Sequence, residues 1–327
     1  MNVAILGSGS WATALAKIAL CNQESINWFI RRQEVIDEFI ATGKNPTYLN
    51  NLKFDVARIN FSADINKVIA ASDVLILAIP SPYIKQSLKK IRRSLHKKII
   101  VNAVKGMIPD ENMLVTEYLH QEFKVPIANL GVIAGPCHAE EIVYERLSYL
   151  TVGCEDRATG QLISKLLDTD FVRATPSTDV IGLEYSSVMK NIYAIAAGMC
   201  EGLRYGDNFQ AVLITNAVLE MEKFISAVNP AHRNVVASGY LGDVLVTSYS
   251  KFSRNRLFGQ MIGQGYSVKA AQMEMQMVAE GFYGTKAIYL ANQRFHVTLP
   301  IVDTMYKILY KHQSPKIGIQ ELTSKLY

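Results

Sequence analysis

The distribution of apolar positions divides the chain into two parts with different periodicities. In the first part, short continuous apolar runs alternate with segments in which apolar residues recur every three or four positions. Continuous runs of this length are typical of parallel strands that helices cover on both faces. The pattern predicts an N-terminal Rossmann-type α/β domain with a doubly wound, mostly parallel sheet. The predicted strands are residues 3–6, 26–30, 73–79, 99–104, 130–134, 149–153 and 171–174, with a helix at residues 157–167 before the last of them.

After Thr178 the periodicity is helical almost throughout, with breaks at residues such as Pro230, Gly239 and Pro300. The pattern of this second part therefore predicts an all-α C-terminal domain. A chain of 327 residues, 49% of them hydrophobic, is long enough for two domains. We expect a Rossmann NAD(P)-binding domain over residues 1–183 and a helical substrate-binding and catalytic domain over residues 184–327.

The segment 185–208 opens the helical part and carries one lysine inside an apolar pattern. Val188, Met189, Ile192 and Ile195 recur at helical spacing around Lys190. A buried ammonium is costly unless it is paired or its pKa falls. Lys190 is therefore either a lysine that extends its head group to water or one with a chemical role. The helix by itself favours the first interpretation.

A glycine turn follows the first strand directly. Gly7, Gly9 and Ala12 form G-x-G-x-x-A between a strand and a helix, the arrangement in which the backbone and the helix N-terminus receive a pyrophosphate. A plain strand-to-helix turn is the alternative, and the flanking elements favour dinucleotide binding.

The second strand ends in two arginines where NAD-specific folds place a carboxylate. Arg31 and Arg32 can pair with the ribose 2′-phosphate of NADP(H), so the site can accept NADP(H) as well as NAD(H). A solvated basic pair at a strand end is the alternative.

Two later strands end in residues suited to binding. Lys105 follows the run at 99–104, and Gly135 follows the run at 130–134. Ligands bind beyond the carboxyl ends of strands in open α/β sheets, which makes both residues candidates for a substrate site. In the helical part, Ser253 is a good N-cap before Arg254 and Asn255, so this helix start is either a capped end or a phosphate site.

Composition narrows the functional classes. The formal net charge of +5 comes from 34 basic and 29 acidic residues spread along the sequence, which favours an anionic small ligand over nucleic acid. No apolar run reaches the roughly 18 residues of a membrane span, and residues 1–6 do not form a signal peptide. The four cysteines are widely spaced, so we expect no metal site and a reduced, cytoplasmic setting. The sequence is compatible with a homodimer and leaves the oligomeric state open.

Taken together, the motifs resemble those of the NAD(P)-dependent glycerol-3-phosphate dehydrogenases of the bacterial type, collinearly over nearly the whole chain. The matching segments are residues 7–16, Asn45 with Tyr48 and Leu49, residues 105–106, 135–139, 189–198, 206–215, 242–247 and 253–259.

The resemblance implies reversible reduction of dihydroxyacetone phosphate to sn-glycerol 3-phosphate by NADH or NADPH, feeding glycerophospholipid synthesis. It makes Lys190 the general acid and base, which a developing alkoxide requires. It implies substrate contacts from Lys105, Gly135, Cys137, Lys190, Asn191, Asp243, Thr247, Ser253, Arg254 and Asn255. The candidate cofactor contacts include the residues of the glycine turn and the arginine pair, and the resemblance adds the others. The full set is Gly7, Gly9, Ser10, Trp11, Arg31, Arg32, Lys105, Ala139, Arg254, Val278 and Glu280.

Four positions depart from the family pattern. Cys137 replaces a serine or threonine, Tyr240 a glycine, Asn50 a proline, and Ser248 a common cysteine. Two other functions stay open: a 3-hydroxyacid dehydrogenase of the 6-phosphogluconate type, and a cofactor-binding redox sensor without turnover. The preference between NADH and NADPH also stays open.

Overall fold

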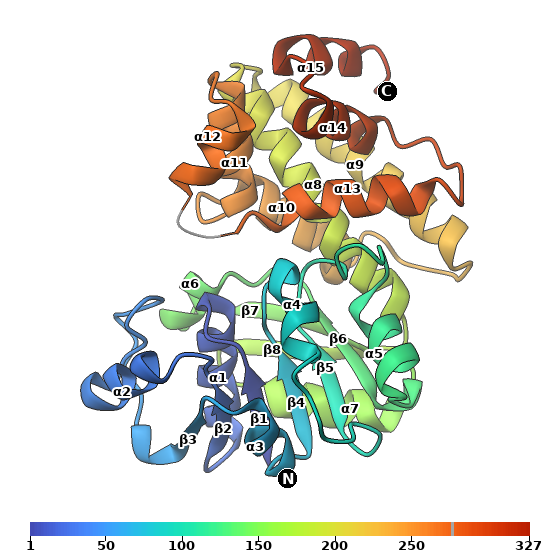
Figure 1. The fold of residues 1–327 in the computed structure, drawn as a ribbon. Coiled ribbons are helices and arrows are strands. Elements are labelled where there is room, and N and C mark those ends of the chain that lie inside the picture. The colour runs from blue at the N-terminus through green and yellow to red at the C-terminus, as the bar shows by residue number, and fades with distance from the viewer. Residues whose placement is uncertain (276–277) are drawn as a thin grey trace. The chain divides into compact units, whose positions relative to one another are not determined.

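The computed structural model describes residues 1–275 and 278–327 and divides into two compact units (Figure 1). One unit comprises Met1–Val104 and Val115–Val180, and the other comprises Lys105–Leu114 and Ile181–Tyr327. The short segment that follows the fifth strand is therefore grouped with the C-terminal helices. The division into domains at residues 183 and 184 stays a prediction.

The N-terminal unit is built on one eight-stranded sheet in the order β3-β2-β1-β4-β5-β6-β7-β8. All neighbouring strands are parallel except β6 and β7, which confirms the predicted mostly parallel Rossmann sheet. The strands are β1 (Val3–Leu6), β2 (Ile26–Phe29), β3 (Ile59–Ser62), β4 (Val74–Leu77), β5 (Ile99–Asn102), β6 (Leu130–Ala134), β7 (Ser148–Cys154) and β8 (Val172–Ser177). β1 and β4 are buried along their whole length, as continuous apolar runs require.

Helices connect the strands of this unit and cover the sheet (Figure 1). α1 packs against α6 and α7, and these helices bury their apolar faces with the strands in one core. The helices are α1 (Ser10–Asn22), α2 (Gln33–Thr42), α3 (Ile65–Ala70), α4 (Ser81–Leu88), α5 (Val115–Phe123), α6 (Ala139–Val143) and α7 (Arg157–Leu167).

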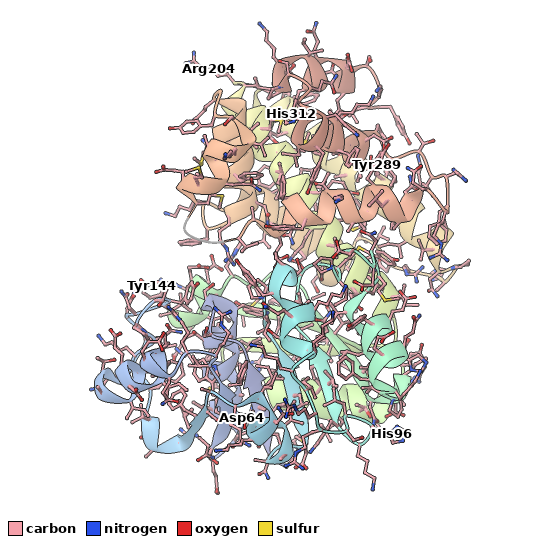
Figure 2. All side chains as sticks on the ribbon, in the orientation of Figure 1. Asp64, His96, Tyr144, Arg204, Tyr289 and His312 are labelled. Atoms are coloured by element: carbon pink, nitrogen blue, oxygen red, sulfur yellow. The ribbon has the colours of Figure 1, made fainter. Side chains whose placement is uncertain are left out.

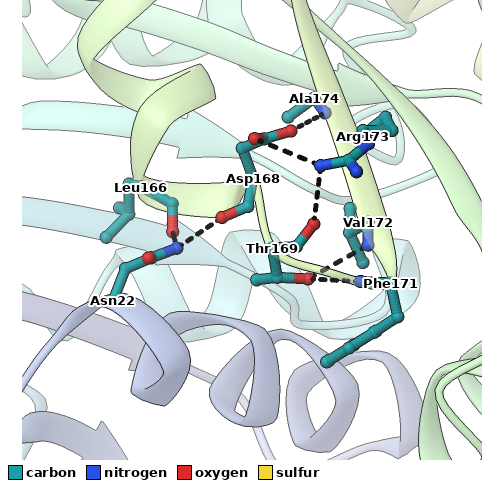
Figure 3. A network of polar contacts seen from close by, with 8 residues as sticks. All are labelled: Asn22, Leu166, Asp168, Thr169, Phe171, Val172, Arg173 and Ala174. Atoms are coloured by element: carbon teal, nitrogen blue, oxygen red, sulfur yellow. Dashed lines mark hydrogen bonds and ion pairs between the residues drawn. The ribbon is translucent and has the colours of Figure 1, made fainter.

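Polar contacts hold the last strand of the sheet to the helices before it (Figure 3). Thr169 accepts hydrogen bonds at Oγ1 from the backbone N–H of Phe171 and Val172, at 3.3 and 3.0 Å. Asp168 accepts from Ala174 N at 3.0 Å, and Asn22 at the end of α1 donates to the Asp168 carbonyl at 2.7 Å. The turn between α7 and β8 is thereby fixed to the end of α1.

The C-terminal unit is helical, as predicted. Its helices are α8 (Val180–Gly202), α9 (Asp207–Val228), α10 (Asp243–Tyr249), α11 (Arg254–Gly263), α12 (Val268–Glu274), α13 (Glu280–Asn292), α14 (Pro300–Lys311) and α15 (Pro315–Thr323), with a π-helical turn η3 (Ser238–Gly242) before α10. Residues 182–200 of α8 are buried without interruption. A helix that is buried on all sides is the core element of its unit.

Candidate functional site

The central feature of the helical unit is a buried ion pair between α8 and α10. Lys190 lies in the middle of α8 and is 1% exposed, so the interpretation that its head group reaches water is wrong. Its Nζ pairs with Oδ1 of Asp243, which is the first residue of α10 and is also 1% exposed. Two buried charges of opposite sign compensate one another and hold the side chains in one geometry.

The surroundings of Lys190 change its acidity. The pKa of the Lys190 ammonium is lowered to about 7, mainly by burial and in smaller part by the positive charge of Lys105, while Asp243 acts in the opposite direction. Near neutral pH both the protonated and the neutral form of the Lys190 amine are therefore populated. A lysine in this state can donate a proton or accept one.

A chain of side-chain amides joins the segments around the ion pair. Asn191, next to Lys190, donates from Nδ2 to the carbonyls of Lys105 and Ser187, both at 3.1 Å. Its Oδ1 accepts from Asn255 Nδ2 at 2.9 Å, and Asn255 Oδ1 accepts from the backbone N–H of Gly281 at 2.9 Å. Both amide hydrogens of Asn191 are therefore used within the protein. The chain fixes Lys105, α8, α11 and α13 to one another.

Glycines allow α11 to lie directly on α8. A Cβ added at Gly259 of α11 would stand 2.0 Å from the carbonyl oxygen of Ile195, and one at Gly198 of α8 would stand 1.9 Å from that of Arg256. Only glycine permits backbones to approach this closely. The contact sets the position of the first turn of α11, which carries Arg254 and Asn255.

The start of α11 is capped by its predicted serine. Ser253 Oγ accepts a hydrogen bond from Arg256 N at 3.3 Å, so the capping interpretation is confirmed. Arg254 is partly exposed and is the first residue of the helix. The capped helix end with its arginine retains the features of an anion site.

The remaining predicted residues of this unit lie on the elements beside these helices. Thr247 is buried and donates from Oγ1 to the Asp243 carbonyl at 2.6 Å, so this hydroxyl stabilises α10. Glu280 begins α13 and is partly exposed, like Val278. Tyr240 is buried within η3, and this turn ends immediately before Asp243. Ser186 Oγ donates a hydrogen bond to the carbonyl of Gly239, the residue before Tyr240, at 3.1 Å. The π-helical turn therefore accommodates the tyrosine that departs from the family pattern.

In the N-terminal unit, the glycine turn has the geometry of a phosphate site. Gly7 has φ +133°, and a Cβ there would stand 2.5 Å from the Ala78 carbonyl oxygen. At Gly9 no protein atom lies within 4 Å of an added Cβ, which leaves space beside the backbone for a ligand. Gly9 caps α1 without a side-chain hydrogen bond, and Ser10 begins the helix. The residues present therefore fit a dinucleotide pyrophosphate.

Asn45 holds this turn and was not among the predicted site residues. Its Nδ2 donates to the Ser8 carbonyl at 3.0 Å and to Thr13 Oγ1 at 2.8 Å. Trp28 donates from Nε1 to the Gly7 carbonyl at 2.7 Å. Asn45 belongs to one of the segments that carry the family resemblance, which is the signal that could have identified it.

The two predicted arginines at the end of β2 have different surroundings. Arg31 lines a pocket of about 880 Å³, whereas Arg32 is not part of the lining. Arg32 instead lies 3.8 Å from Glu34 in an exposed ion pair. The structure therefore favours Arg31 over Arg32 as the residue available to an anion.

Trp11 lies in the first turn of α1, and its side chain is partly buried. The other predicted residues of this unit follow β6. Gly135 has φ +117°, and Cys137 and Ala139 are buried in the core at the start of α6. The sulfur of Cys137 is not part of a disulfide.

Within the described part of the chain, no three His, Cys, Asp or Glu side chains are grouped as a metal site would require. None of the helices over residues 1–275 and 278–327 is long and apolar enough to cross a membrane.

Family models match both parts of the chain. The model described as NAD-dependent glycerol-3-phosphate dehydrogenase N-terminus matches residues 2–160, and the model of the C-terminus matches residues 179–320. Among curated relatives, the glycerol-3-phosphate dehydrogenase [NAD(P)+] of Clostridium botulinum is 33% identical over 98% of this chain and 96% of its own length. The protein of the same name from Chlorobium limicola is 32% identical over 99% of this chain and 98% of its own length.

Solved structures agree with these matches. The crystal structure of glycerol-3-phosphate dehydrogenase from Coxiella burnetii has a TM-score of 0.90 and 28% identity, covering 98% of both chains. A 2-dehydropantoate 2-reductase from Geobacter metallireducens has a TM-score of 0.63 at 14% identity, covering 96% of this chain and 100% of its own, and shares the fold alone.

Proposed function

The chain belongs to the family of NAD-dependent glycerol-3-phosphate dehydrogenases, and from that premise we propose that it reversibly reduces dihydroxyacetone phosphate to sn-glycerol 3-phosphate. The observation that carries the proposed mechanism is the buried Lys190, whose pKa is lowered to about 7. The nicotinamide cofactor, when bound, supplies the hydride.

Lys190 is the general acid of the reduction in this proposal. As the carbonyl carbon of the substrate receives the hydride, its oxygen becomes an alkoxide, and the ammonium of Lys190 donates a proton to that oxygen. In the reverse direction the neutral amine removes the hydroxyl proton. General acid–base catalysis of this kind contributes about 10²- to 10⁴-fold.

Asp243 orients Lys190 and favours its protonated form. Its carboxylate pairs with Nζ and stabilises the ammonium against the cost of burial. Thr247 donates to the Asp243 backbone and steadies the start of α10. We assign both residues a positioning role, beside the substrate contacts that the family resemblance implies for them.

The substrate phosphate is bound by cations and by the start of α11. Lys105 and Arg254 supply positive charge, and the backbone amides after Ser253 supply hydrogen-bond donors. The amide hydrogens of Asn191 are already used by the protein, and the Asn255 side chain bridges Asn191 and Gly281. These two side chains therefore position the phosphate site, and Gly135 and Cys137 keep their implied contacts with substrate.

The pyrophosphate of the dinucleotide is bound by the N-terminal unit. Gly7, Gly9 and Ser10 receive the pyrophosphate, with Asn45 holding the turn. Trp11, Ala139, Val278 and Glu280 stay cofactor contacts by family resemblance. All four cysteines lie in the described part of the chain and none is part of a disulfide, which is compatible with a reducing compartment. We place the enzyme in the cytoplasm, where its product would supply glycerophospholipid synthesis.

The test is a turnover assay of the purified chain with dihydroxyacetone phosphate, run with NADH and NADPH in parallel. We expect oxidation of the reduced cofactor and accumulation of glycerol 3-phosphate. Tight cofactor binding without turnover would instead support a redox sensor. Faster turnover of a 3-hydroxyacid than of glycerol 3-phosphate would support a dehydrogenase of the 6-phosphogluconate type.

A further inference from the structure

Two polar contacts join α8 to the segment that leads into α10. Ser186 and Lys190 are four residues apart on α8, so their side chains project from one face of that helix, one turn apart. Their partners, Gly239 and Asp243, are also four residues apart. A neutral hydrogen bond of 3.1 Å and an ion pair therefore join the same faces of the two elements at neighbouring turns.

The π-helical turn η3 connects the two contacts rigidly. Gly242, its last residue, has φ −59° and ψ −41°, and Asp243 has φ −72° and ψ −34°, so the helical backbone continues from η3 into α10. The backbone N–H of Asp243 donates to the carbonyls of Ser238 and Tyr240 within the turn. Single π-helical turns of this kind are frequent at functional sites. A displacement of η3 would move Asp243 with it.

The hydrogen bond of Ser186 is shielded from water. Arg204 and His312 of the same unit are exposed (both labelled in Figure 2), whereas Ser186 is fully buried. Gly239, whose carbonyl accepts the bond, is buried as well. Solvent cannot replace a donor that is lost at such a position, so the carbonyl would keep the cost of its desolvation. Without the Ser186 hydroxyl, η3 should therefore shift.

The protonation of Lys190 depends on where the Asp243 carboxylate lies. Among the described residues, the charged side chains that act on Lys190 are Asp243 of α10 and Lys105 of the segment after β5. Asp243 raises the pKa of Lys190, whereas Lys105 lowers it. Because electrostatic attraction weakens with distance, a carboxylate that moves away from Nζ favours the ammonium less.

We propose that Ser186 is a positioning residue for Asp243: its hydrogen bond to Gly239 holds the π-helical turn, and with it the Asp243 carboxylate, in contact with Lys190. The inference rests on the proposed role of Lys190 as general acid and base. It adds to the site a residue that lies outside the segments of the family resemblance. Ser186 acts through Asp243 rather than on the substrate.

The experiment measures the titration of Lys190 directly, in the full chain without substrate or cofactor. Nuclear magnetic resonance follows lysines that are isotope-labelled at Cε, and the Lys190 signal is the one that disappears in Lys190→Met. In Ser186→Ala the midpoint should fall by about 0.5 to 1, because the carboxylate is held less closely. The pH profile of kcat/KM for ketone reduction should move to lower pH by the same amount. At pH 7 the protonated fraction, and with it the rate, should drop by about two- to fivefold.

Ser187→Ala is the matched control. Ser187 is the next residue of α8 and is also buried, but its Oγ has no hydrogen-bond partner in the part of the chain that the structure describes. Removing this hydroxyl should leave the midpoint of Lys190 unchanged.

A double variant tests whether Ser186 acts through Asp243. In the background of Asp243→Asn, the charge that Ser186 positions is already absent. Ser186→Ala should therefore cause no further shift of the Lys190 midpoint there.

An unchanged midpoint in Ser186→Ala, a midpoint displaced to higher pH, or a shift of equal size in Ser187→Ala would overturn the assignment. A full shift in the background of Asp243→Asn would overturn it as well. The titration needs no turnover, so its result is independent of the dehydrogenase assay. A chain without turnover whose Lys190 midpoint responds to Ser186→Ala retains the positioning role, and an active enzyme without that response loses it.

Discussion

Replacing Asp243 by asparagine tests how the protein tunes Lys190. The variant keeps the size of the side chain and removes the negative charge that pairs with Nζ. Asp243 raises the pKa of Lys190 against the larger, opposite effect of burial. Without the carboxylate, burial and the charge of Lys105 act unopposed, so the pKa of Lys190 should fall below its present value of about 7.

The magnitude follows from the geometry of the pair. An opposite charge in direct contact shifts a pKa by about 1 to 3, at about 1.4 kcal/mol for each pKa unit. The pKa of Lys190 in Asp243→Asn should therefore lie at about 4 to 6. At pH 7 the protonated fraction would drop from about one half to about one tenth or less. Because the reduction needs the protonated amine, its rate at pH 7 should drop by about fivefold or more.

The assay is the pH dependence of kcat/KM for ketone reduction, compared between the wild-type chain and Asp243→Asn. Activity of the wild type should fall as the pH rises through about 7, since the general acid is then lost. In the variant the same fall should occur at lower pH, so that activity is partly restored in acid. A loss of substrate binding alone would lower the whole profile without moving its midpoint. An unchanged midpoint, or one displaced to higher pH, would refute this account of Lys190.

Two more variants test the supporting structure of each unit. Asn45→Ala removes the side chain that fixes the glycine turn, and titration should show about tenfold weaker binding of NADH and NADPH alike; unchanged affinity would remove Asn45 from the site. Gly259→Ala forces a Cβ to 2.0 Å from the Ile195 carbonyl oxygen, and denaturant unfolding should show a loss of about 1–3 kcal/mol or more. Gly160→Ala, whose Cβ would come no closer than 3.4 Å to its neighbours, should be neutral or stabilising, and equal effects of the two substitutions would contradict the close-packing argument.

The pattern of apolar residues was sufficient to predict most strands of the Rossmann sheet, because these strands are buried on both faces. The predicted strand at residues 130–134 coincides with β6, and the predicted helix at 157–167 coincides with α7. β3 was missed because its four residues, Ile59–Ser62, are half polar and lie at the edge of the sheet, where only the first is fully buried. A strand of this kind has no continuous apolar run to reveal it.

The chemistry of the site could be predicted only in part, since side-chain partners depend on the fold. Lys190 and Asp243 were both named from the sequence, but the burial that lowers the pKa of Lys190 appears only in the structure. The sequence motif places Asn191 among substrate ligands, whereas its amide hydrogens are bonded to protein carbonyls. Arg31 and Arg92 lie far apart along the chain, and only the fold brings them to the lining of one pocket.

The most direct test of the central claim is the turnover of a chain that lacks the amine of Lys190. Lys190→Ala, with Lys190→Met as a second variant that fills the space, should lower kcat by about 10²- to 10⁴-fold in both directions. Lys269→Ala, which removes an exposed lysine of the same unit, is the matched control and should retain full activity. The affinity for NADH should stay nearly unchanged in all three variants, which also shows that they are folded. Turnover of both Lys190 variants within a few-fold of the wild type would contradict the assignment of Lys190 as the general acid and base.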